Sequence, residues 1–90
     1  MKQIEIKGDK ISILDVRAAI VKEEYIQMGK KQMVCHLTLE DGWEVIGVAG
    51  VVNPALFNES IGKEISYSKA LDKVWLHLGS LLQNKLAKQN

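Results

Sequence analysis

Asp41 and Gly42 separate two stretches of alternating apolar and polar residues, and this pair constrains the fold more than any other neighbours in the chain. A two-residue Asp-Gly loop fits a type I′ turn, because glycine adopts positive φ freely and aspartate tolerates it better than most residues. The turn predicts an antiparallel hairpin in which Leu37 lies opposite Ile46. One predicted face then consists of Met33, Cys35, Leu37, Leu39, Ile46 and Val48.

The opposite face of the predicted hairpin is also rich in apolar residues. It consists of Val34, His36, Thr38, Trp43, Val45 and Ala49. Such a face is too apolar for a purely solvated surface. We therefore expect it to be covered, either by an N-terminal helix of the same chain or by another subunit.

The residues before the hairpin predict a short helix and one further strand. Ser12 followed by Asp15 is the pattern of a capping box, which starts a helix. From Ile20 onward, apolar and charged residues alternate until Gly29-Lys30-Lys31 interrupts them, which indicates two strands joined by a turn. Residues 1–10 are either an extension or an edge strand, because isoleucines alternate with charged residues there as well.

The last third of the chain predicts helices. Asn53-Pro54 is typical of an N-cap followed by proline at the first helical position. Beyond it, apolar residues recur mostly at spacings of three and four, which predicts one stripe of a long helix. The stripe consists of Ile61, Ile65, Leu71, Val74, Trp75, Leu78, Leu81, Leu82 and Leu86. Gly62 and Gly79 lie within it, and a bend near Gly62 or close backbone packing at Gly79 would account for them.

Together these elements predict one α+β domain over residues 1–90. Residues 11–52 hold a short helix and a three-stranded antiparallel meander, and residues 53–87 hold the C-terminal helices, the last of them long. A chain of this length buries only about 60–65% of its unfolded surface, so its core is thin. One cysteine excludes an internal disulfide, and the cysteine and two histidines lack zinc-type spacing. We therefore expect an oligomer.

Charge and hydropathy exclude several classes of protein. Twelve Lys and Arg against eleven Asp and Glu leave a net charge of +1, whereas nucleic-acid binders are normally strongly basic. The longest apolar stretch, Val45 to Val52, is far shorter than the roughly 20 residues of a membrane span. The first residues show no apolar segment of a secretion signal. With the single cysteine, these features indicate a protein of a reducing cytoplasm.

No pattern in the sequence is typical of catalysis. Cys35 and His36 are adjacent, but adjacent residues of a strand point to opposite faces, so the thiol and the imidazole do not meet. The serines lack a histidine at a suggestive spacing, and the glycines form no phosphate-binding loop. We therefore expect a protein that is not an enzyme and that uses no cofactor and no metal.

A few residues suggest a binding site. Arg17, the only arginine, offers a planar fork that suits phosphate. Phe57, the only phenylalanine, is either a core plug at the entry to the long helix or a ring on which a nucleobase stacks. In the second case Asn58 reads the polar edge of the base. Tyr67 and Lys69 follow two to three turns later and supply a second ring and a cation.

Three segments of the chain resemble a known family. Thr38–Gly47, Asn53–Lys63 and Ala70–Trp75 carry the hairpin, a Pro-x-x-Phe-Asn motif followed by Ile-Gly, and an Ala-x-x-Lys-Val-Trp motif. Over about residues 15–87 the chain resembles the small phage proteins named for phage N-four gene forty-nine and Sf-six gene sixty-six. It departs from their pattern at Leu78-Gly79-Ser80, where members carry Glu-Gly-Tyr, and in its first ten residues.

This resemblance implies a phage or prophage origin. In layout the chain is also similar to the phage anti-Thoeris proteins, which capture cyclic ADP-ribose isomers, and in some cases cyclic oligonucleotides, in pockets at subunit interfaces. The similarity implies a homo-oligomer, either a dimer or a larger assembly such as a hexamer. Such a protein sequesters a nucleotide second messenger in the cytoplasm of the infected host. It also implies Phe57 as the stacking ring, Arg17 as a phosphate ligand, and the Tyr67–Lys69 stretch as pocket wall.

A second hypothesis comes from a different class of function. The chain would be a small adaptor or inhibitor that docks on a host enzyme through the face carrying Trp43. DNA binding is a third hypothesis, which the near-neutral charge disfavours.

Overall fold

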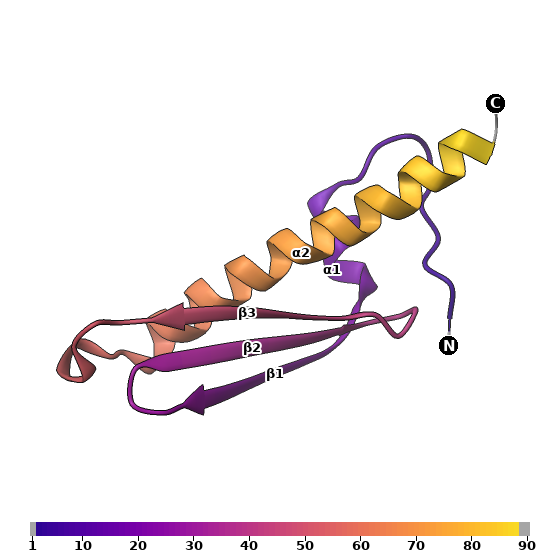
Figure 1. Ribbon diagram of the computed structural model, residues 1–90. Coiled ribbons are helices and arrows are strands. Elements are labelled where there is room, and N and C mark those ends of the chain that lie inside the picture. Colours follow the sequence, from indigo (N-terminus) through magenta and orange to yellow (C-terminus); the bar gives the residue numbers. More distant parts are fainter. Residues whose placement is uncertain (1, 89–90) are drawn as a thin grey trace.

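The computed structural model describes residues 2–88, and within them the predicted α+β fold is confirmed. The elements are α1 (Ile13–Ala19), β1 (Ile20–Met28), β2 (Gln32–Leu39), β3 (Glu44–Gly50), the 3₁₀ turn η1 (Pro54–Leu56) and α2 (Glu59–Lys88). The strands form an antiparallel sheet in the order β1-β2-β3. Both α-helices lie on the same side of this sheet, so the molecule has two layers (Figure 1).

Helix α1 begins where the sequence predicts, because Ser12 and Asp15 form a complete capping box. The Ser12 hydroxyl accepts the Asp15 N–H at 3.2 Å, and the Asp15 carboxylate accepts the Ser12 N–H at 2.8 Å. These reciprocal bonds satisfy backbone N–H groups that the start of a helix leaves without partners. Val16 and Ala19 are buried in the core, and the chain then passes directly into β1.

The hairpin loop between β2 and β3 is one residue longer than predicted. It consists of Glu40–Gly42, closed by hydrogen bonds from the Gly42 N–H to the Leu39 carbonyl and from the Leu39 N–H to the Trp43 carbonyl. Gly42 has a φ of +87°, whereas Asp41 has a negative φ. A type I′ turn requires positive φ at both positions, so that prediction is wrong. The loop matches a type I turn followed by a left-handed glycine.

The longer loop shifts the register by one residue and thereby turns β3 over. Leu37 lies opposite Val45, not opposite the predicted Ile46. Val45 and Ala49, expected on the second face, are buried, while Ile46 and Val48, expected in the core, are exposed. The observed helix-facing residues of β2 and β3 are Met33, Cys35, Leu37, Leu39, Val45, Gly47 and Ala49.

Helix α2 packs on the sheet through a column of residues spaced four apart. The buried positions are Gly62, Ser66, Ala70, Val74 and Leu78. Because the first three are small, the helix backbone reaches β3 at Gly47. A Cβ atom built on Gly47 would lie 2.1 Å from the Ser66 carbonyl oxygen and 2.4 Å from the Ala70 nitrogen. Helix and strand are therefore in direct backbone contact here.

The predicted apolar stripe of α2 is wrong at its start. Ile61 and Ile65 are exposed, because the close approach to β3 requires small side chains at the contact. The glycines also differ from expectation. A Cβ on Gly62 would lie 3.2 Å from the Met33 Cβ, whereas a Cβ on Gly79 would have no neighbour within 4 Å. Close packing is thus found at Gly62 and not at Gly79, and nothing in the structure explains the glycine at Gly79.

The structure also shows the conformation of the N-terminal residues and the role of Asn53. Residues 2–12 form an extension and not an edge strand; Ile6 is buried, and the Lys85 ammonium of α2 donates to the Ile6 carbonyl at 2.5 Å. Asn53 caps η1 and not the long helix, because its Oδ1 accepts the Ala55 N–H at 3.0 Å.

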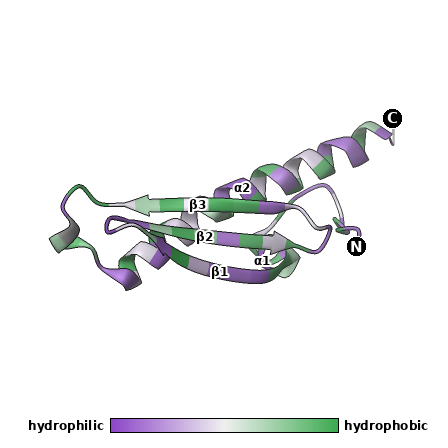
Figure 2. Cartoon of the chain, turned by 60° about the horizontal axis from the view of Figure 1, so that its bottom comes forward, coloured by the Kyte–Doolittle hydropathy of each residue, from purple (hydrophilic) through white to green (hydrophobic). Residues whose placement is uncertain are grey.

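The outer face of the sheet, opposite α2, has no described segment of the chain across it (Figure 2). Helix α1 packs on the other side, where Val16 and Ala19 join the same core cluster as Val74 of α2. The N-terminal helix is therefore not the cover of this face, which was one of the two predicted covers.

Candidate functional site

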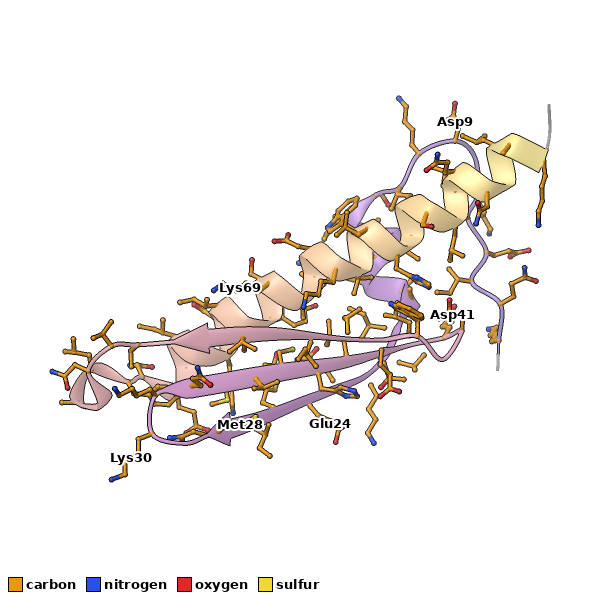
Figure 3. The ribbon with its side chains drawn as sticks, viewed as in Figure 1. Asp9, Glu24, Met28, Lys30, Asp41 and Lys69 are labelled. Carbon is orange, nitrogen blue, oxygen red and sulfur yellow. The ribbon has the colours of Figure 1, made fainter. Side chains whose placement is uncertain are left out.

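The β2–β3 hairpin tip is attached to α2 by Asp41. Its Oδ2 lies 2.7 Å from His77 Nε2 of α2, and its Oδ1 accepts the Trp43 N–H at 3.0 Å. Figure 3 shows Asp41 at the end of the hairpin, close to the helix. Both Asp41 and His77 are largely shielded from solvent. The contact joins parts of the chain 36 residues apart.

The hydrogen bonds keep Asp41 ionised. Burial alone would raise the pKa of this carboxyl. The hydrogen bonds from His77 and from the Trp43 backbone favour the charged form, and together they hold the pKa below its ordinary value of 3.8. An ionised carboxylate only accepts hydrogen bonds, so His77 carries its proton on Nε2 in this arrangement.

The Trp43 indole stacks on the His77 imidazole. The ring centroids lie 5.0 Å apart and the ring planes differ by only 2°. Asp41 fixes the orientation of the imidazole, which in turn holds the indole. Trp43 remains 54% exposed, so part of this ring is available for contact. An exposed indole held in one orientation is well suited to stacking on a flat ligand, since little side-chain freedom is lost on binding.

The stacked rings border an open groove of about 690 Å³ between the edge of β3 and α2, which we call the Trp43 groove. It is lined by Trp43, Glu44, Val45, Ile46, Lys73, Leu76, His77 and Ser80. Its volume falls within the usual range of small-molecule sites. It combines an aromatic surface, aliphatic walls and the Lys73 ammonium, which are the groups that bind a nucleobase and a phosphate.

Two of the residues predicted for binding lie together at the start of α2. Asn58 Oδ1 accepts the Ile61 N–H at 3.1 Å, so this side chain caps the helix. Phe57 is half-buried, and its ring atoms lie 3.5 and 3.6 Å from the position of a Cβ on Gly62. Both residues therefore contribute to the structure of the helix entry, and the Asn58 amide nitrogen is the part left for a ligand.

The other three predicted residues do not form one wall. Burial raises the pKa of Tyr67, the negative charge of Glu23 raises it further, and the positive charge of Arg17 partly opposes this. Arg17 and Tyr67 therefore lie within electrostatic range of each other. Lys69 is two residues from Tyr67, which places it about 200° around the helix, and it projects from α2 away from the sheet (Figure 3).

Sequence reasoning missed most of the Trp43 groove. His77 gave no signal, because its partner Asp41 is distant in sequence. The one available signal is Trp43 itself, a large aromatic residue directly after a tight turn and on a predicted apolar face. Among residues 2–88, no three His, Cys, Asp or Glu side chains gather as a potential metal site. None of the helices described has the length and apolar character of a membrane span.

The fold defines a small two-layer α+β protein with a lateral groove. The model of the Phage protein (N4 Gp49/phage Sf6 gene 66) family matches residues 11–86, and the chain belongs to this family. The predicted family is thus confirmed, while the likeness to the anti-Thoeris proteins stays a prediction. A search of the curated proteins and a search of the solved structures each gave no match.

Proposed function

We propose that this phage protein binds a small nucleotide immune messenger in the Trp43 groove and sequesters it in the cytoplasm of the infected host without cleaving it. The messenger would be a cyclic ADP-ribose isomer or a cyclic oligonucleotide. The observation that carries the proposal is the stack of Trp43 on His77 beside Lys73. The similarity in layout to the anti-Thoeris proteins suggests the class of ligand.

In this mechanism the base stacks on the exposed part of the Trp43 ring. The Lys73 ammonium neutralises a phosphate, and Leu76 covers the apolar edge of the ligand. Base–aromatic stacking contributes about 1–3 kcal/mol, which corresponds to roughly 5- to 150-fold in affinity. The protein acts by mass action, because stoichiometric binding lowers the free messenger below the level that activates its effector.

Calorimetric titration with cyclic ADP-ribose isomers and with cyclic di- and trinucleotides tests the proposal directly. We expect one of these ligands to bind with a micromolar or lower Kd. Heating the complex and chromatographing the released ligand should return it unchanged. If no member of the panel binds at micromolar concentration, the proposal fails, and if a cleaved product is recovered, the protein is an enzyme.

Two lysines of α2 locate the site. Lys73→Ala removes the groove cation and should weaken binding about tenfold. Lys69→Ala removes a charge one helical turn away, outside the groove lining, and should weaken binding clearly less. Trp43→Ala should weaken binding at least as much as Lys73→Ala. Equal losses for the two lysine variants would exclude the groove. A loss on Phe57→Ala and Lys69→Ala alone would place the site at the start of α2.

The exposure of two large apolar side chains favours a second candidate function. Trp43 is 54% exposed and its groove neighbour Leu76 is 74% exposed, and such a pair is typical of a protein-docking surface. The protein would then inhibit a host enzyme by docking through this groove. Capture of one host protein by the wild type, lost on Trp43→Ala, together with no binding of any nucleotide, would favour this function.

A further inference from the structure

The outer face of the sheet is ordered in four rows that each cross all three strands. From the β2–β3 hairpin toward the β1–β2 hairpin they are Lys22–Thr38–Glu44, Glu24–His36–Ile46, Ile26–Val34–Val48 and Met28–Gln32–Gly50. The third row is entirely apolar; Ile26 is 60% and Val48 37% exposed at its two ends, and Val34 between them is 9% exposed. Glu24 and Met28 point away from α2 (Figure 3). An exposed apolar centre on a sheet face is typical of an interaction surface.

We propose that a second copy of this chain packs on the outer face, with a two-fold axis parallel to β2. Sheets that pack face to face align their strands within about 30°. With this axis each row lies over the same row of the second copy with its order reversed, so that β1 of one copy lies over β3 of the other. The interface is therefore self-complementary if opposite ends of a row match.

The ends of three of the four rows match in charge or in size, whereas in the second row Glu24 lies over Ile46 of the second copy. In the first row Lys22 lies over Glu44 of the second copy, which gives two ion pairs per dimer. In the last row the long side chain of Met28 lies over Gly50, which has none. The apolar third row lies on itself and forms the centre of the interface.

The polar side chains of the face are already held in place. His36 Nε2 lies 2.7 Å from Glu44 Oε1, and the Lys22 ammonium lies 3.5 Å from Glu24 Oε1. The Lys22 and Glu44 side chains are still more than half exposed, so each can take a partner in the second copy. A preordered polar rim reduces the entropy lost on association.

The other face-to-face two-fold axis runs across the strands through Val34. It stacks β1 on β1, which places Lys22 of one copy toward Lys30 in the β1–β2 turn of the other. Like charges then meet at both ends of β1, and such contacts cost free energy. The charge pattern therefore favours the axis parallel to β2.

The size of the face predicts a weak dimer. Strands about 4.8 Å apart with a rise of about 3.3 Å per residue give the four rows an extent of roughly 15 by 23 Å. Two such faces bury on the order of 1,000 Å² with their side chains, which is near the lower limit for a specific interface. We expect a Kd in the micromolar range.

Sedimentation equilibrium up to about 200 µM tests the dimer. The wild type should approach twice the chain mass of 10.1 kDa. Ile26→Arg should give a monomer with an unchanged circular dichroism spectrum, because Ile26 is exposed in one chain. Ile65→Arg makes the same change at an exposed position of α2 and should leave the dimer intact. A monomeric wild type, or a dimer unaffected by Ile26→Arg, would overturn the proposal.

Charge reversal tests the orientation. Lys22→Glu brings two acidic groups together and should raise the dimer Kd roughly tenfold or more. Adding Glu44→Lys restores opposite charges across the interface and should return the Kd to near the wild-type value. If Lys22→Glu has no effect, or if the double variant dissociates further than the single one, the axis parallel to β2 is wrong.

Discussion

The substitution Gly47→Ala tests the packing of the two layers. An alanine Cβ at this position would lie 2.1 Å from the Ser66 carbonyl oxygen, whereas ordinary contact begins at 3.4 Å. The helix would have to move by about 1.3 Å, the difference between these two distances. No rotamer change relieves the overlap, because the atoms that it meets belong to the backbone of α2.

The cost follows from this displacement. Overpacking of a core usually costs about 1–3 kcal/mol, and contact with backbone atoms places Gly47→Ala at about 3 kcal/mol or more. A 90-residue domain has a total stability of about 5–13 kcal/mol. One kcal/mol changes the Tm of such a domain by about 4–8 °C. We therefore expect the Tm to fall by at least about 12 °C.

Thermal unfolding followed by circular dichroism at one fixed protein concentration measures this effect. Gly79→Ala is the matched control, because a Cβ there meets nothing within 4 Å and alanine favours a helix. This control should raise the stability by up to about 1 kcal/mol. If Gly47→Ala unfolds within about 4 °C of the wild type, α2 and β3 are not in backbone contact at Gly47.

Three further predictions concern single side chains. Asn58→Ala removes the cap of α2 and should lower the free energy of unfolding in urea by about 1 kcal/mol; an unchanged midpoint would show that the cap contributes nothing. The fold lowers the pKa of the Asp41 carboxyl, so the ionised carboxylate stabilises the folded protein. This contribution is complete at a pH above the pKa that Asp41 has in the unfolded chain, and it is lost as the pH falls through the lower pKa of the folded chain. Urea titrations from pH 5 to about pH 2 should therefore show a smaller acid-induced loss for Asp41→Asn than for the wild type, and parallel curves would contradict this. Cys35 is buried and burial raises its pKa, so a thiol reagent should modify it far more slowly in the native protein than in urea, and equal rates would contradict its burial.

The elements that depend on local signals were predictable from the sequence. Ser12 and Asp15 start α1 through bonds within a single turn, and the family motifs identified the phage family. The alternation of apolar residues located the strands, because it reflects the two faces of a strand. These features need no information about distant parts of the chain.

The register of the hairpin could not be predicted locally, because Asp41-Gly42 fits both a two-residue and a three-residue loop. The helix decides between them. In the predicted register Ile46 and Val48 would face α2, and neither fits where the helix backbone touches the strand. Only Gly47 allows that contact. The contact made by the small residues of α2 was not predicted either, because a pattern of large hydrophobic residues does not reveal contacts made by glycine, serine and alanine.

The candidate site depends on the same tertiary contact. Asp41 and His77 meet only because α2 lies across the end of the hairpin, so no spacing in the sequence predicts their contact. Phe57 was predicted as either a core residue at the entry to the long helix or a stacking ring, and Asn58 as a ligand-binding residue. In the structure Phe57 packs near Gly62 and Asn58 caps α2. Whether they also bind a ligand is decided by the lysine and phenylalanine variants.

The length of the loop Glu40–Gly42 determines which residues of β3 face α2 and which face solvent. Deleting one of its residues would rotate β3 by half a turn about its own axis, moving Gly47 to the solvent and Ile46 toward the helix. Adding one residue would do the same. Substitutions at Glu40 are therefore compatible with the fold, whereas changes of length, or of Asp41 and Gly42, alter the contacts of the hairpin. We expect members of this phage family to keep the length of this loop.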